Sequence, residues 1–193
     1  AYEELREFQN AVEAYKEYLS LNPKNPGEAY RRLGLCQGEL KDFEGAIVSF
    51  QETLKEIPED VKINRKLAEA YQDVGQLDKA AEVYTFLTQI SPEDSRIYFN
   101  TIIRMYDEAK LPDKAIEALQ KMIEVDPTNT DVLYNLGYMY QKQKKYNEAI
   151  EAYNKALEID PNMEFAYLQL GYCYNLTKRP KDLVTISEKF VKL

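Results

Sequence analysis

The chain of 193 residues is 45% apolar and 30% charged, which is typical of a folded protein and argues against disorder. Its formal net charge of -8 opposes binding to nucleic-acid phosphates, and no apolar run approaches the roughly 18 to 20 residues of a membrane span. The sequence has no histidine, which removes the commonest general base and the commonest metal ligand. We therefore expect no nucleic-acid binding, no membrane insertion, no metal or other cofactor and no catalysis.

A repeat of 34 residues runs along the whole chain. Five prolines recur at intervals of 34 or 35 residues, and we place each of them at position 32 of a unit. They are Pro23, Pro58, Pro92, Pro127 and Pro161. The chain is then a single array of a partial repeat at 1–25, repeats at 27–60, 61–94, 96–129 and 130–163, and a partial C-terminal repeat at 164–193.

Each repeat contains two predicted helices, A at positions 1 to 14 and B from about position 15 to 30. In chain order we expect a B helix near 7–21, preceded by the remnant of an A helix at 1–5. Pairs of A and B helices then follow in the units that begin at 27, 61, 96, 130 and 164, which gives about eleven helices. The proline at position 32 ends each B helix because it cannot donate the helical hydrogen bond.

Small and aromatic residues recur at fixed positions of this register. Position 20 is alanine in five successive units, position 8 is usually Gly or Ala, and positions 11 and 24 are mostly aromatic. The alanines are Ala11, Ala46, Ala80, Ala115 and Ala149. We expect the small residues at positions 8 and 20 to face each other, so that helices A and B approach closely.

This pattern resembles the tetratricopeptide repeat (TPR) family, in which L-G, Y, A-x3-F/Y and P follow one another over 34 residues. The resemblance covers essentially the whole chain and implies an all-α protein, a right-handed superhelical α-solenoid of helix-turn-helix repeats. Because one unit cannot bury its own apolar face, stability is expected to come from contacts between neighbouring repeats.

The two cysteines, Cys36 and Cys173, both occupy position 10 and are expected to be small core residues. Four repeats separate them, so they lie too far apart for a disulfide. Free thiols favour a reducing compartment, and we expect the protein to be cytoplasmic.

The resemblance also indicates a binding surface. In the TPR family, positions 2, 5, 6, 9, 12 and 13 of the A helices line a concave groove, which here changes from basic to aromatic and amide-rich along the chain. The groove residues that we expect to bind a peptide are Arg31, Arg32, Lys62, Arg65, Lys66, Asn100, Arg104, Tyr134, Asn135, Tyr138, Phe165, Leu168, Gln169 and Tyr172. Such a surface suits a protein ligand with acidic and apolar segments.

Two alternatives remain: only the aromatic end of the groove binds, or the partner binds elsewhere on the chain. Arg31 and Lys66 would then only balance nearby acids. No frame of three A helices carries the residues with which chaperone-binding TPR domains hold a C-terminal carboxylate, so we expect no such clamp.

We therefore expect a non-catalytic protein-protein interaction module, a TPR scaffold or adaptor that binds a peptide segment in its concave groove. One alternative is a regulatory or substrate-recruiting arm of a larger enzyme, since the partial first repeat suggests a piece of a longer chain. Another is self-association through the C-terminal helix, whose apolar residues include Ile186, Phe190 and Val191.

Overall fold

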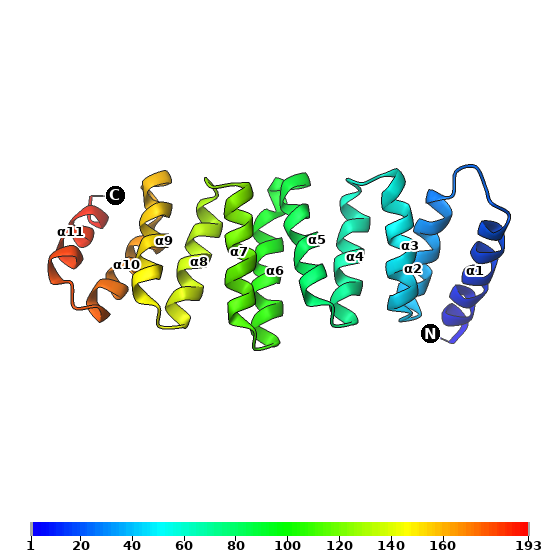
Figure 1. The fold of residues 1–193 in the computed structure, drawn as a ribbon, viewed down its shortest axis with the longest axis horizontal. Helices are drawn as coiled ribbons and strands as arrows, with labels where there is room; N and C mark the ends of the chain where they lie inside the picture. The colour runs from blue at the N-terminus through cyan, green and yellow to red at the C-terminus, as the bar shows by residue number, and fades with distance from the viewer. Residues whose placement is uncertain (1, 193) are drawn as a thin grey trace. The chain divides into compact units, whose positions relative to one another are not determined.

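The computed structural model describes residues 2–192, and the side chains from residue 6 onward. Within that range the chain forms eleven α-helices, one short 3-10 helix and no strand, so the expected all-α class is confirmed (Figure 1). The helices are α1 (Tyr2–Ser20), α2 (Gly27–Glu39), α3 (Phe43–Glu56), α4 (Val61–Asp73), α5 (Leu77–Ile90), η1 (Pro92–Asp94), α6 (Ser95–Glu108), α7 (Pro112–Val125), α8 (Thr130–Lys142), α9 (Tyr146–Ile159), α10 (Glu164–Leu176) and α11 (Pro180–Phe190).

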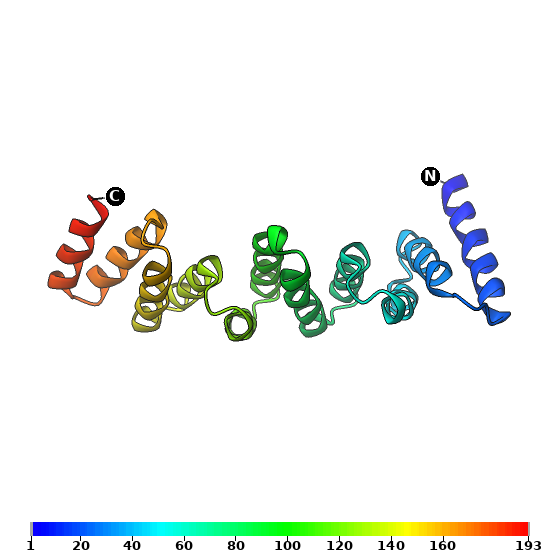
Figure 2. The ribbon, with the colours of Figure 1, turned by 90° about the horizontal axis from the view of Figure 1, so that it is seen from above.

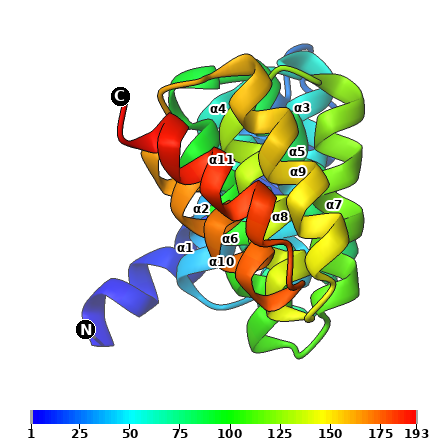
Figure 3. The ribbon, with the colours of Figure 1, turned by 90° about the vertical axis from the view of Figure 1, so that its left-hand side faces the viewer.

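The chain divides into two compact units, and the division falls inside α6. Unit 1 ends at Tyr98 and unit 2 begins at Phe99. In unit 1, α1 packs on α2, α2 on α3, α3 on α4 and α4 on α5. In unit 2, α7, α8, α9, α10 and α11 pack in the same sequential way, and α8 also contacts α10 (Figure 2). In Figure 3 the ribbon is turned so that α9, α10 and α11 of unit 2 face the viewer.

Prolines begin and follow the B helices as the register predicts. Pro112 and Pro180 are the first residues of α7 and α11, where the missing N–H costs little because it would have no helical partner. Helices α7 and α9 end at Val125 and Ile159, two residues before Pro127 and Pro161. Proline therefore marks both ends of α7, the start of α11 and the end of α9.

The turn from each A helix to its B helix uses one backbone conformation five times. Position 15 has positive φ in every described A-B pair, and the residues are Lys41, Gly75, Lys110, Lys144 and Lys178. At each turn the next residue's N–H donates to the carbonyl five residues earlier, as in the bond of 2.9 Å from Lys145 to Tyr140. This is the Schellman arrangement, which satisfies the last carbonyls of a helix. Four lysines hold a conformation that ordinarily favours glycine.

The first helix differs from the expectation. The sequence predicted an A-helix remnant at 1–5 and a separate B helix near 7–21, whereas α1 is one continuous helix from Tyr2 to Ser20. Its position 15 is Arg6, which is helical, and no Gly or Pro interrupts residues 2–20. Residues 2–5, ahead of position 15, make only about one turn of helix, which is too short to be stable as a separate helix, so they extend α1.

Close contact between helices A and B depends on a ring rather than on the alanine at position 20. A Cβ added at Gly137 would lie 2.6 Å from Cε1 of Tyr153, and one added at Gly34 would lie 2.6 Å from Cε1 of Phe50. Both rings stand at position 24 and are buried. Only at Gly171, where position 24 is not aromatic, is the nearest atom Cδ1 of the position-20 residue, at 3.5 Å. The small residue at position 8 thus makes room for the ring.

Candidate functional site: an apolar stripe and a self-paired charged surface

Helix α10 is apolar on two opposite faces. One face is buried in the core of unit 2 through residues that include Leu170 and Cys173, both fully buried. The other carries a stripe of exposed side chains with exposed fractions between 41% and 70%. This α10 stripe consists of Phe165, Leu168, Tyr172 and Leu176. Their spacing of three, four and four residues aligns them along one side of the helix.

The neighbouring A helix extends this surface. Tyr138 of α8 is 41% exposed, and α8 contacts α10 directly. Gln141 of α8 donates through Nε2 to Oε1 of Gln169 of α10, at 2.8 Å. Oε1 of Gln141 also accepts hydrogen bonds from Tyr153 Oη at 2.9 Å and Cys173 Sγ at 3.5 Å. One glutamine therefore fixes the separation of the two A helices, and Gln169 is held in place rather than free to move.

Two of the predicted residues on α8, Tyr134 and Asn135, are half-buried and contact other parts of the protein. The ring centroid of Tyr134 lies 5.6 Å from that of Tyr153, and burial raises the pKa of Tyr134. Nδ2 of Asn135 donates to the carbonyl of Asp131 at 2.8 Å, which leaves its side-chain oxygen as an acceptor. These two side chains make most of their contacts within the protein, and they contribute less exposed surface than Tyr138 does.

Helix α6 contributes polar groups to unit 2. Asn100 and Arg104 are exposed one helical turn apart. Lys142 of α8 donates to Oδ1 of Asp107 of α6 at 2.7 Å, so an ion pair connects these two A helices. Arg104 is the one cation among the groove residues predicted in unit 2. Its guanidinium forms no ion pair with any residue that the structure describes, so it remains available to a partner.

The basic residues predicted on unit 1 are largely paired with acids of their own chain. Arg32 Nε lies 2.7 Å from Glu28, and this hydrogen bond, followed by one to Tyr15, raises the pKa of Arg32. The other two pairs are Arg31 with Asp60 at 3.6 Å and Lys66 with Glu69 at 2.7 Å. Lys62 and Arg65 are exposed without an ion pair among the described residues. Three of the five predicted cations are therefore already neutralised.

Unit 1 also has a small hollow of about 130 Å³ between α2 and α4. It arises where Gly38 presents no side chain, at the position that Gln141 occupies in unit 2. Its lining includes the carboxylates of Glu39, Glu69 and Asp73 beside the ammonium of Lys66. The A-helix surface of unit 1 is thus mixed in charge, not uniformly basic.

Two classes of feature are missing from the part of the chain that the structure describes. No group of three or more His, Cys, Asp or Glu residues there could hold a metal ion. No helix in that part is sufficiently long and apolar to cross a bilayer. The two cysteines are free thiols, as predicted.

Comparison with known families gives four matches along the chain. Models described as tetratricopeptide repeat match residues 1–61, 39–98 and 130–163, and a model described as TPR repeat matches residues 113–144. The match at 130–163 has the same bounds as the repeat predicted from the prolines.

Among curated proteins, the chain is 31% identical over 129 residues to BBSome complex member BBS4 of Bos taurus, and 26% identical over 101 residues to the protein CTR9 homolog of Arabidopsis thaliana. These alignments cover 67% and 51% of this chain but only 24% and 9% of those proteins.

Among solved structures, a crystal structure of MamA protein is 26% identical, covers 86% of this chain and 90% of its own, and gives a TM-score of 0.53. A crystal structure of YrrB, described as a TPR protein with an unusual peptide-binding site, is 15% identical, covers 94% and 92%, and gives a TM-score of 0.52. The YrrB likeness shows the fold alone.

Proposed function

Because this chain belongs to the tetratricopeptide repeat family, we propose that it is a protein-interaction scaffold that binds a peptide segment of a partner on the A-helix surface of unit 2. The observation that carries the proposal is the α10 stripe, whose four large apolar side chains are exposed on a helix that is already buried on its other face. Contiguous exposed apolar surface of this kind marks interaction sites.

The chemistry of the surface defines the partner segment. Aromatic and aliphatic side chains at its centre suit an apolar anchor, because Tyr and Phe bury large area with little loss of conformational freedom. Tyr138 and Tyr172 also present hydroxyl groups, and the free oxygen of Asn135 accepts hydrogen bonds from a peptide backbone. Arg104 suits an acidic residue of the partner. We therefore infer an apolar segment with an acidic flank.

Selection from a displayed library of random 16-residue peptides on the 193-residue chain tests this proposal. Enriched peptides should contain two or more large apolar residues and an acidic residue. When such a peptide carries a photoreactive benzophenone, its cross-links should map to α8 and α10 of unit 2. Failure to enrich any peptide, or cross-links confined to B helices, would contradict the proposal.

Self-association is a second candidate, and a specific surface favours it. Exposed Val184 and Val191, on and just after α11, form an open apolar face together with Leu183 and Ser187. A second copy of the chain would bury this apolar face. Light scattering after size-exclusion chromatography should then show a mass that rises with concentration, and Val184→Asp should abolish the rise. A strict monomer at millimolar concentration would rule this candidate out.

A further inference from the structure

A separate hollow lies on the B-helix side of unit 2, among α7, α8 and α9. Its volume is about 240 Å³, and its lining combines an apolar floor with charged groups. The floor includes Leu133 and Leu136, the wall includes Tyr140, and the rim carries Glu148, Glu151 and Lys155. Tyr140 and Tyr138 are two residues apart on α8, so they point in roughly opposite directions on a helix of 3.6 residues per turn. The hollow is therefore separate from the α10 stripe.

Unit 1 contains the equivalent groove among α3, α4 and α5. Nε2 of Gln51 donates to the Tyr71 hydroxyl at 2.9 Å, just as Nε2 of Gln120 donates to the Tyr140 hydroxyl at 2.9 Å in unit 2. The two glutamines occupy the same repeat position, and so do the two tyrosines. Because the same bond holds each ring, the two tyrosine rings form corresponding walls.

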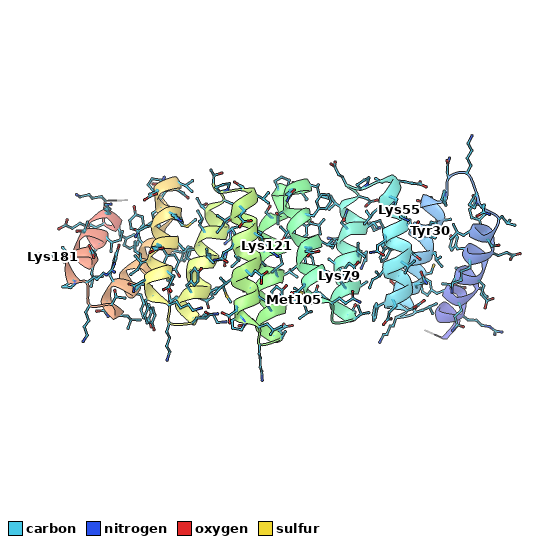
Figure 4. All side chains as sticks on the ribbon, viewed as in Figure 1. Tyr30, Lys55, Lys79, Met105, Lys121 and Lys181 are labelled. Carbon is cyan, nitrogen blue, oxygen red and sulfur yellow. The ribbon has the colours of Figure 1, made fainter. Side chains whose placement is uncertain are left out.

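The groove of unit 1 is filled by its own chain. The ammonium of Lys79 lies 5.5 Å from the centroid of the Tyr71 ring, which is a cation–π contact (Lys79 is labelled on α5 in Figure 4). Val83 and Phe86 of α5 stand at the repeat positions of Ala152 and Lys155, which line the hollow of unit 2, and both are partly buried. In unit 1 the tyrosine ring is therefore contacted by a lysine of the same chain.

In unit 2 the residues that would fill the groove are replaced. Glu148 stands where unit 1 has Lys79, Ala152 stands in place of Val83, and Lys155 stands in place of Phe86. The loss of the larger side chains opens the hollow. The exchange at the first position also puts a carboxylate beside the tyrosine where unit 1 has an ammonium. Neither Glu148 nor Glu151 forms an ion pair with another described residue.

We propose that this hollow binds a lysine or arginine side chain of a partner protein, presented between apolar residues. The aliphatic stem lies over Leu133 and Leu136, and the cation lies against the Tyr140 ring beside the two carboxylates, in the arrangement that Lys79 has in unit 1. A volume of about 240 Å³ is below that of sites for drug-sized ligands and suits one side chain. This site is independent of the peptide surface proposed above.

Two short peptides that differ only in charge provide the test. Acetyl-Gly-Leu-Lys-Leu-Gly-amide and the same peptide with norleucine in place of lysine are titrated into the ¹⁵N-labelled 193-residue chain. The lysine peptide should saturate shifts of backbone amides around Gln120, Tyr140 and Glu148, with at least tenfold higher affinity than the norleucine peptide. Double substitution of Glu148→Gln and Glu151→Gln should reduce that affinity at least fivefold.

Substitution Glu148→Lys supplies the cation within the chain, as in unit 1, and should abolish binding of the lysine peptide. Glu59→Lys, at an exposed position after α3, makes the same charge change outside the hollow and should leave binding unchanged. A circular dichroism melt of each variant confirms that it is folded. Equal affinity for the two peptides, unchanged binding by Glu148→Lys, shifts confined to α10, or no saturable shift would each overturn the proposal.

Discussion

The A-helix surfaces of the two units are built from the same repeat positions, but they differ in which side chains remain available to a partner. In unit 1 the positions carry Arg31, Arg32 and Lys66, and each is paired with an acid of its own chain. In unit 2 the positions carry aromatic and aliphatic side chains, of which Phe165 is 70% exposed. A nearby carboxylate of the same chain can neutralise a cation, as Glu69 does for Lys66, whereas an exposed ring needs another apolar surface.

The comparison shows which side chains remain available to a partner once the chain has folded. Exposed ion pairs contribute little free energy and exchange readily with solvent, so a paired surface offers a partner only a small net gain. Apolar side chains that stay exposed offer the full gain of burial, about 25 cal/mol for each Å² removed from water. Unit 2 is therefore the better candidate for a peptide surface, and the following experiments test that ranking.

The largest effect is expected on the α10 stripe. The double substitution Leu168→Ser with Tyr172→Ser should weaken a selected peptide by about 2 kcal/mol or more, roughly thirtyfold in affinity, because buried anchors dominate interface energy. Fluorescence anisotropy with the labelled peptide measures it. The matched control is Val48→Ser with Val125→Ser, which removes similarly exposed apolar groups from B helices. Equal losses in the two variants would place the binding elsewhere.

A stability effect should distinguish two helix A glycines, one in each unit. Gly137→Ala would place its Cβ 2.6 Å from a fully buried ring, so we expect destabilisation of about 1–3 kcal/mol. Gly38→Ala meets no atom within 4 Å and should stabilise the chain by about 0.5–1 kcal/mol through helix propensity. Urea unfolding measures both. A stabilising Gly137→Ala would show that the ring can move aside.

The two thiols at position 10 should also behave differently. Burial raises the pKa of Cys173 to about 11, and it also raises the pKa of Cys36, which is only partly buried and therefore more accessible to reagents. Ellman's reagent should therefore modify Cys36 at least tenfold faster at pH 8 in the folded chain. Comparable rates would mean that unit 2 opens readily.

The pH dependence of stability follows from the same shift. Below about pH 9 both the folded and the unfolded chain keep the Cys173 proton, so stability does not depend on this group. As pH rises from about 9 toward 11, the unfolded chain releases a proton that the folded chain retains, and stability falls. Urea midpoints between pH 7.5 and 10.5 should fall less in Cys173→Ala than in Cys36→Ala. The same decline in both variants would assign it to tyrosines such as Tyr153, whose pKa burial also raises.

The smallest effect is expected from the basic residues of unit 1. Charge reversal by Arg31→Glu, Arg65→Glu and Lys66→Glu together should change affinity for the selected peptide less than threefold, because two of these cations are already paired. Anisotropy titrations at low and physiological salt measure the change. A loss of tenfold or more would show that both units contribute to one binding surface.

The repeat register was predictable because it depends on residues whose role is local. Proline ends a helix whatever surrounds it, and the recurring prolines were sufficient to place the B-helix ends of α3, α5, α7 and α9. The αL turns were harder, since four of the five carry lysine and not glycine. The continuity of α1 was missed because its position 15 gave no visible sign of lacking the turn.

The candidate site was only partly predictable, because its properties depend on neighbours from other helices. The positions on the A helices could be chosen from the family pattern. Which of these side chains are already paired could not be predicted. Arg31 pairs with Asp60, the residue just before α4, and Gln169 is held by Gln141 from another repeat. The filled and open grooves around Tyr71 and Tyr140 likewise required positions to be compared between repeats.

The contact between the residue at position 12 and the ring at position 24 limits which substitutions such a chain can accumulate. In the four full repeats, the residues at positions 12 and 24 change together: Gly38 with Phe50, Gln72 with Tyr84, Asp107 with Leu119, and Gln141 with Tyr153. The two tyrosine hydroxyls donate to the two glutamines at 2.7 and 2.9 Å. A change at position 12 or 24 alone would leave a tyrosine hydroxyl or a glutamine without its partner. Positions 12 and 24 are therefore coupled, and we expect them to change in pairs.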